Sequence, residues 1–189
     1  MTETIFKYRG LVWGTLAVAV LIFPVYPSMP RFVASIPILA LGQALRFWAA
    51  GVIPKYRTLV VDAPELVTWG PYAFARNPLY AGNGIMGLGW SLMAGWGWAA
   101  AFAVLYIALY LMVIIPHEEK FLFERFGEEY EQYKKSTPAI FPRLANIRDK
   151  AALIRGFDAK KSWFMERHSL RMNIVVTILV LVRLYHSAK

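Results

Sequence analysis

The sequence contains no cysteine and few charged residues. Asp, Glu, Lys and Arg make up 17% of its 189 residues, whereas a soluble domain carries about 25%. The absence of cysteine excludes disulfide frameworks and cysteine-ligated metals. Apolar residues make up 58% of the chain, which argues against a soluble enzyme, a disordered tail and a nucleic-acid-binding module despite the net charge of +9. The composition indicates an integral membrane protein with no nucleic-acid partner.

Several apolar runs approach the length of about 20 residues that crosses a bilayer. Residues 10–26 and 32–53 form the first two, and the first is read as a retained span because it ends in prolines and not in a signal-peptide cleavage site. Residues 79–115 contain no charge over 37 positions, which predicts two helices joined near Gly95. Residues 172–182 are shorter and span only if the flanking arginines snorkel; the alternative is an interfacial or re-entrant segment.

These runs predict an all-α fold, a polytopic integral-membrane helical bundle of about five transmembrane helices with a cytoplasmic C-terminal helical segment. With the N-terminus in the cytoplasm, that side receives 17 of the 21 Lys and Arg residues. The opposite side receives three, and Arg46 lies within a span. The positive-inside rule therefore predicts a cytoplasmic N-terminus. The small size of the chain favours a prokaryotic cytoplasmic (inner) membrane over the endoplasmic reticulum.

We expect one integral membrane domain over residues 1–189. Residues 1–53 would form a first helical hairpin, 54–143 the core, and 144–189 a basic amphipathic segment followed by a hydrophobic helix. Helical spacing of apolar side chains predicts a helix that begins near His117 and ends before Pro138. Residues 145–167 are basic and amphipathic, which is typical of a helix on an anionic membrane surface; the alternative is a solvated tether.

One motif in the third run imitates a nucleotide-binding fingerprint. Residues 82–87 read Gly-Asn-Gly-Ile-Met-Gly, but the GxGxxG fingerprint requires a preceding strand and a βαβ unit. Small residues then continue at four-residue spacing as Gly87, Ser91 and Gly95. This arrangement favours close packing between membrane helices over nucleotide binding.

Arg46 is a charged residue inside an apolar run, with Gln43 near its helical face. Ionisable residues at membrane depth are functional-site candidates by default. The alternative is that the Arg46 side chain snorkels to the interface. The residues alone leave both interpretations open.

Two polar clusters flank the charge-free hairpin of residues 79–115. Because the two ends of a hairpin return to one face, the clusters should meet at the cytoplasmic rim. Both signs of charge there suit a zwitterionic ligand, with Arg76 for its carboxylate and a glutamate for its ammonium group. The alternative is an ordinary helix boundary whose glutamates pair only with Lys120 or Arg125. The clustered residues are Arg76, Asn77, Tyr80, His117, Glu118 and Glu119.

These residues belong to an ordered pattern that resembles a family of small integral-membrane methyltransferases. The family includes isoprenylcysteine carboxyl methyltransferases and phospholipid N-methyltransferases. The resemblance covers about residues 40 to 143, including the segment 42–49. The residues that carry it are Gly70-Pro71-Tyr72, Arg76-Asn77-Pro78-Leu79-Tyr80-Ala81-Gly82, Glu118-Glu119, Phe126-Gly127, Tyr130, Tyr133 and Pro142.

The resemblance implies that S-adenosyl-L-methionine is the methyl donor and that residues 54–143 form the methyltransferase core. The acceptor would be a lipid or prenylated small molecule that enters from the membrane lipids. Tyr130 and Tyr133 would close the site. The implied cofactor-binding residues are Arg76, Asn77, Pro78, Tyr80, Gly82, His117, Glu118, Glu119, Tyr130 and Tyr133.

The reaction would need different residues for the two acceptor classes. A prenyl-type carboxylate needs no base and would be held by a cation such as Arg46 or Arg76. A phospholipid headgroup amine must lose a proton, for which His117 or a glutamate such as Glu119 is a candidate. The chain has Asn77 where the isoprenylcysteine enzymes usually have His, and His117 where many members have Lys or Arg.

Two other functions compete with methyl transfer. Membrane reductases of the sterol-reductase type share the C-terminal architecture and use NADPH, and they usually show Asn-Tyr-x-Gly-Asp where residues 78–83 here read Pro-Leu-Tyr-Ala-Gly-Asn. Residues 78–83 match the methyltransferase pattern better than this reductase sequence, which favours methyl transfer. The third possibility is a non-enzymatic membrane protein whose paired glutamates only anchor a helix.

Overall fold

The computed structural model describes residues 28–54, 64–143 and 150–187. These residues are helical throughout their regular parts and contain no strand, which confirms the all-α class. The expected span at 10–26 lies outside the described residues. Two helical stretches, Met29–Val52 and Trp96–Phe126, are long and apolar enough to cross a membrane.

The second expected span corresponds to helix α2, Met29–Val52. Pro30 lies in its first turn, where a missing backbone N–H costs nothing. The helix ends before Pro54, because the residue that precedes a proline is disfavoured in helical geometry. The apolar run of residues 32–53 therefore predicted this helix to within a few residues at each end.

The charge-free run forms the expected hairpin. Helix α3 spans Pro78–Ala94 and helix α4 spans Trp96–Tyr106. Gly95 joins them with φ +141°, a backbone conformation that residues other than glycine rarely adopt. The second arm continues through a π-helical stretch, η2, Ile107–Ile114, into helix α5, Ile115–Phe126. The predicted turn near Gly95 is confirmed.

The glycines of the GxGxxG motif lie at helix crossings. A Cβ atom on Gly82 would lie 2.5 Å from Arg46 Cγ and 2.9 Å from the backbone oxygen of Gly42 on α2. Gly87 faces the ring of Phe102 on α4. The interpretation of this motif as a packing device is confirmed, because α3 is a continuous helix at these positions.

The helix predicted to run from His117 to Pro138 is broken at Gly127. Gly127 has φ +54°, so α5 ends at Phe126 and helix α6, Glu128–Ser136, begins anew. A short 3-10 turn, η1, Gly70–Ala73, lies before α3. The interpretation as one helix was wrong because the apolar side chains keep their spacing across the break.

The C-terminal part differs most from the prediction. Helix α7, Lys150–Ile154, is short, and helix α8, Ala159–Ser187, is a single helix of 29 residues. It joins the end of the basic segment to the apolar run at 172–182, which were expected to be separate. Asp158 caps it, since its Oδ1 accepts from the backbone N–H groups of Lys160 and Lys161 at 2.8 and 3.0 Å. These backbone donors lower the pKa of Asp158.

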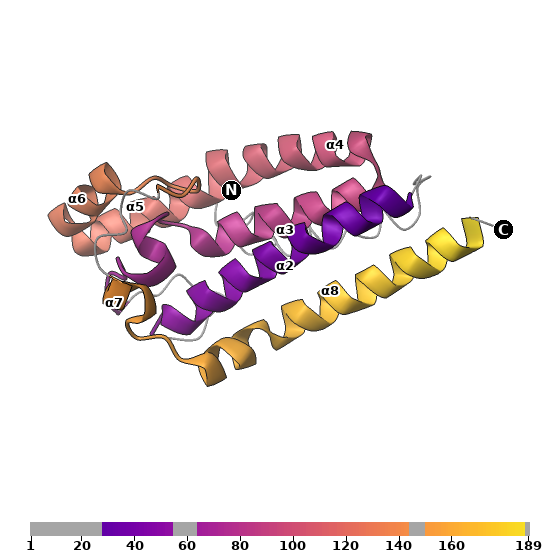
Figure 1. The fold of residues 1–189 in the computed structure, drawn as a ribbon. Coiled ribbons are helices and arrows are strands. Elements are labelled where there is room, and N and C mark those ends of the chain that lie inside the picture. Colours follow the sequence, from indigo (N-terminus) through magenta and orange to yellow (C-terminus); the bar gives the residue numbers. More distant parts are fainter. Residues whose placement is uncertain (1–27, 55–63, 144–149, 188–189) are drawn as a thin grey trace.

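The long helices lie side by side in a fixed order. Figure 1 shows α3 between α4 and α2, with α8 on the other side of α2. Helices α5 and α6 gather at the end of the bundle opposite the turn that joins α3 to α4 (Figure 1). This arrangement produces two polar regions, one at that end and one between α2 and α8.

Candidate functional site

The predicted convergence of the two flanking clusters occurs at an ion pair between Arg76 and Glu119. Arg76 Nε and Nη2 donate to Glu119 Oε1 at 3.0 and 2.6 Å. The two side chains are only 9% and 10% exposed. Lys134 Nζ on α6 lies 3.2 Å from the other carboxylate oxygen. Glu119 therefore ties the segment before α3 to both α5 and α6.

The backbone around Arg76 is fixed by the chain that follows α6. The N–H groups of Arg76 and Asn77 donate to the carbonyl oxygens of Pro138 and Ala139 at 2.9 and 3.0 Å. The Asn77 side-chain amide donates to the same Ala139 carbonyl at 3.2 Å. Arg76 Nη1 also donates to the carbonyl of Thr137 at the end of α6. The prolines that end the predicted helix thus bring its last residues back to Arg76.

Tyr80 connects the start of α3 to the first turn of α5. Its hydroxyl donates to Glu118, the neighbour of Glu119. Its backbone carbonyl accepts a hydrogen bond of 2.6 Å from the Tyr106 hydroxyl. Pro78 opens the helix at its first position, so that Tyr80 lies in the first turn of α3. His117 is half-buried directly before Glu118.

Tyr130 and Tyr133 are buried in the core beneath this cluster. The Tyr133 hydroxyl donates to the backbone carbonyl of Tyr72 at 2.6 Å. Burial raises the pKa of both phenols, and the nearby Glu119 carboxylate raises the pKa of Tyr130 further while Arg76 opposes it. Both hydroxyls therefore stay protonated at neutral pH. The hydrogen bond of the Tyr133 hydroxyl fixes α6 onto the segment that precedes α3.

A second polar cluster lies between α2 and α8, and Arg46 is its centre. Arg46 Nε and Nη2 each donate to a Glu166 carboxylate oxygen at 2.7 Å. Arg46 Nη1 donates to the side-chain oxygen of Asn83 on α3. The exposed fractions of the Arg46 and Glu166 side chains are 11% and 4%. Arg46 is thus paired within the bundle and does not extend to an interface, and its role as a functional-site residue stays a prediction.

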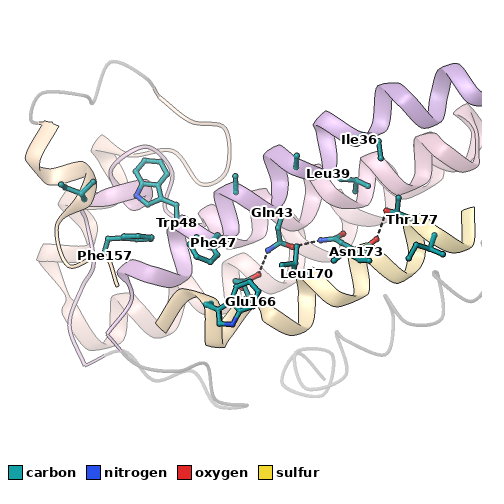
Figure 2. Close-up of a pocket in the computed structure, with 16 residues that line it drawn as sticks. Ile36, Leu39, Gln43, Phe47, Trp48, Phe157, Glu166, Leu170, Asn173 and Thr177 are labelled. Carbon is teal, nitrogen blue, oxygen red and sulfur yellow. Dashed lines mark hydrogen bonds between the residues drawn. The ribbon is translucent and has the colours of Figure 1, made fainter. Parts of the chain in front are cut away.

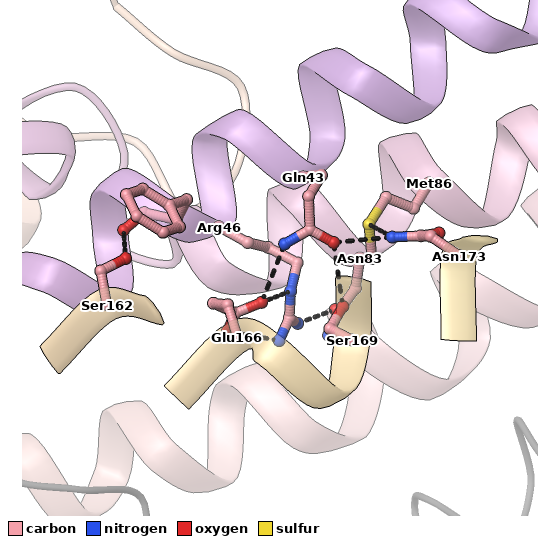
Figure 3. A network of polar contacts seen from close by, with 9 residues as sticks. Gln43, Arg46, Asn83, Met86, Ser162, Glu166, Ser169 and Asn173 are labelled. Atoms are coloured by element: carbon pink, nitrogen blue, oxygen red, sulfur yellow. Dashed lines mark hydrogen bonds and ion pairs between the residues drawn. The ribbon is translucent and has the colours of Figure 1, made fainter. Parts of the chain in front are cut away.

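Gln43 extends this cluster along α8, as Figure 3 shows. Its Nε2 donates to Glu166 at 3.3 Å, and its Oε1 accepts from Asn173 Nδ2 at 2.6 Å and from Ser169 at 3.2 Å. Glu166 and Asn173 are not among the site residues expected from the sequence. Their signal is a polar stripe at helical spacing, formed by Glu166, Ser169, Asn173 and Thr177.

The site residues expected from the sequence therefore divide between the two clusters. Arg46 and Gly82 lie where α2 crosses α3, on the side that faces α8. The other members lie around the ion pair at the end of the bundle. Within the described residues there is no group of three or more His, Asp or Glu placed to hold a metal ion. The members of the end cluster are Arg76, Asn77, Pro78, Tyr80, His117, Glu118, Glu119, Tyr130 and Tyr133.

Comparison with known proteins finds one matching family model and several similar proteins. A family model described as phospholipid methyltransferase matches residues 30–129. A nickel-cobalt-cadmium resistance protein, NccN, of Alcaligenes xylosoxydans is 37% identical over 146 residues, which cover 73% of this chain and 62% of the relative. The protein-S-isoprenylcysteine O-methyltransferase of Schizosaccharomyces pombe is 32% identical over 128 residues, 65% of this chain and 52% of that enzyme.

A third relative comes from another reaction class. The steroid 5-alpha-reductase DET2 of Solanum lycopersicum is 29% identical over 114 residues, 60% of this chain and 42% of the reductase. The chain thus spans less than two thirds of the length of each of these three relatives. No solved structure matches.

Proposed function

Because this chain belongs to the phospholipid methyltransferase family, we propose that it transfers a methyl group from S-adenosylmethionine to a lipophilic acceptor at one face of the membrane. The observation that carries the proposal is the buried ion pair of Arg76 and Glu119. It joins the two halves of the family-like motif, and Glu118 and Tyr80 lie beside it.

The chemistry of this cluster fits the proposed cofactor. The methionine end of S-adenosylmethionine carries a carboxylate and an ammonium group, so its site needs both a cation and an anion. The cluster supplies Arg76 and Lys134 as cations and Glu118 and Glu119 as anions. When bound, the cofactor supplies an electrophilic methyl group on a sulfonium. The half-exposed Lys134 would reach its carboxylate, and Glu118 would accept from its ammonium group.

The residues around the cluster would act by orientation and by excluding water. The Arg76 guanidinium and the backbone of residues 138 and 139 keep the start of α3 in place. Tyr80 would hold Glu118 toward the ligand. For an amine acceptor, His117 or Glu119 would take the proton that the nucleophile loses.

Of the two acceptor classes, we favour an amine of a phospholipid headgroup. A prenyl-type carboxylate held at Arg46 would have to displace Glu166, which already occupies two guanidinium nitrogens. An amine acceptor requires no change at Arg46. The carboxylate class remains testable beside it, and in that class Arg76 would be the alternative cation.

We further propose that the chain crosses the membrane about five times, with residues 10–26, α2, α3, the arm from α4 to α5, and α8 as the spans. The excess of Lys and Arg on one side places the N-terminus and the end cluster in the cytoplasm of a prokaryotic cell. Because the chain has no cysteine, single cysteines test this directly. A membrane-impermeant maleimide added to intact spheroplasts should label Glu124→Cys poorly and Trp96→Cys well; the reverse pattern contradicts the orientation.

The activity is tested by methyl transfer in a native lipid setting. The full chain in nanodiscs should transfer tritiated methyl groups from S-adenosylmethionine into a lipid extract that contains phosphatidylethanolamine. A prenylcysteine analogue tests the carboxylate class. Glu119→Gln should lose most of the transfer, whereas Glu124→Gln, an exposed residue on the same helix, should keep it. Absence of transfer to every lipid would contradict the proposal.

The similarity to the tomato reductase supports one alternative, an NADPH-dependent membrane reductase. The two functions differ in their cofactors, so the same preparation separates them. A reductase would consume NADPH in the presence of an enone lipid and would transfer no methyl group.

A further inference from the structure

A large apolar groove lies between α2 and α8, on the other side of α2 from α3 and α4. Its volume is about 780 Å³, within the range of about 300 to 1,000 Å³ that ligand sites occupy. Leu39, Phe47, Leu170 and other apolar side chains line its walls, as Figure 2 shows. Arg76, Glu118 and Glu119 do not line it. The groove is therefore separate from the proposed methyl-transfer site.

The few polar groups in the groove fix one another's orientation. The Glu166 carboxylate only accepts hydrogen bonds, so the Gln43 amide must turn its Nε2 toward it. Gln43 Oε1 then faces Asn173 and can only accept, so Asn173 must present its Nδ2 there. The Asn173 amide therefore cannot be reversed without breaking this chain of bonds.

This orientation leaves the Asn173 side-chain oxygen on the side of its amide away from Gln43 (Figure 3). Asn173 is only 7% exposed, and its Oδ1 makes no hydrogen bond within the described part of the chain. The hydroxyl of Thr177, one turn along α8, donates to the backbone carbonyl of Asn173 instead. A buried acceptor with no donor is rare in native proteins and calls for a partner.

The charges in the groove specify what kind of donor fits. Glu166 is the charged residue that lines the groove, and Arg46 beside it neutralises its carboxylate through two contacts of 2.7 Å. Arg46 does not itself line the groove, and apart from Glu166 the amide and hydroxyl side chains that line it are Gln43, Asn173 and Thr177. A phosphate or ammonium headgroup would have no counter-charge there. A neutral ligand with one hydroxyl group fits better, because the hydroxyl can donate to Asn173 Oδ1 while its hydrocarbon chain packs against the apolar walls.

We propose that this groove binds a neutral long-chain alcohol, whose isoprenoid or alkyl chain lies against the apolar walls and whose hydroxyl donates to Asn173 Oδ1. The hydrocarbon chain of this ligand would lie along α2 and α8, between Phe157 and Trp48 at one end and Ile178 at the other. The site goes beyond the proposed methyl transfer, because it needs neither the cofactor nor the end cluster.

Photolabelling of the full chain in nanodiscs tests the proposal. The probes are a hexadecanol that carries a diazirine and the matched diazirine alkane without the hydroxyl, with labelled peptides mapped by mass spectrometry. We expect the alcohol to label residues of α2 and α8 that line the groove about fivefold more than the alkane does, the preference that one neutral hydrogen bond provides. Equal labelling by both probes would overturn the role of Asn173.

Three variants make the experiment specific. Ile174→Trp should fill the groove and abolish its labelling, whereas Val175→Trp, at a half-exposed position outside the lining, should leave it unchanged. Asn173→Leu should keep labelling by the alkane and remove the preference for the alcohol. Thermal unfolding of each variant establishes that it is folded. Groove labelling that survives Ile174→Trp would overturn the site itself.

Discussion

Arg46 on α2 and Glu166 on α8 form a bidentate ion pair with both contacts at 2.7 Å, although 120 residues separate them in the sequence. The pair lies largely away from solvent and is the polar centre of the contact between these two helices. Because the C-terminal helix lies beyond the region matched by the family model, this contact attaches a part of the chain that the family pattern does not include.

Removing one partner of this pair should be much worse than removing both. Glu166→Ala leaves Arg46 as a buried unpaired cation, and we expect the free energy of unfolding to fall by about 3 to 5 kcal/mol. The double variant Arg46→Met with Glu166→Leu should regain most of that loss. Reversible unfolding in mixed micelles, followed by circular dichroism, measures both. Equal losses of unfolding free energy in the single and double variants would contradict the view that an unpaired Arg46 causes the loss.

The crossing of α2 and α3 depends on the absence of a side chain at Gly82. Gly82→Ala would place a methyl group 2.5 Å from Arg46 Cγ and 2.9 Å from the Gly42 carbonyl oxygen. We expect a loss of about 1 to 3 kcal/mol from overpacking. The control is Gly97→Ala on α4, where the added Cβ meets nothing within 4 Å. The same unfolding measurement should find Gly97→Ala neutral or stabilising, and a matching loss in the two variants would contradict the close crossing.

Tyr133 should make the protein sensitive to alkali. Its folded pKa is raised by burial, so the unfolded chain loses the phenol proton near pH 10 while the folded chain keeps it. The stability from this group is complete below pH 10 and falls as the pH rises above it. Tyr133→Phe should cost about 1 kcal/mol at pH 7 through the lost hydrogen bond to Tyr72, and should reduce the decline above pH 10. An unchanged alkaline decline would exclude Tyr133 as its source.

The parts of the fold that the sequence predicted follow from local signals. An apolar run interrupted only by Arg46 placed α2, a charge-free run placed the hairpin of α3 and α4, and Gly95 marked the turn because only glycine readily adopts its backbone conformation. The meeting of Arg76 and Glu119 followed from the hairpin topology, which returns both of its ends to one place.

The parts that the sequence did not predict depend on contacts between distant residues. Glu166 lies in a basic segment and looked solvated, and only the approach of Arg46 from another helix makes its burial possible. Hydropathy counts each charge as a cost, so the apolar run was predicted to begin only after Arg171. Helix α8 instead begins at Ala159 and continues through that arginine. The break at Gly127 was missed because the apolar spacing continues from α5 into α6.

The central claim, that the cluster around Arg76 and Glu119 holds an adenosyl methyl donor, is tested most directly by titration calorimetry of the full chain in detergent. S-Adenosylhomocysteine should bind the wild type and the Glu124→Gln variant equally. It should bind Glu119→Gln at least about tenfold more weakly, because Arg76 and Lys134 lose the carboxylate that positions them, and NADPH should not bind. Binding of NADPH without either adenosyl compound, or adenosyl binding unchanged by Glu119→Gln, would contradict the account.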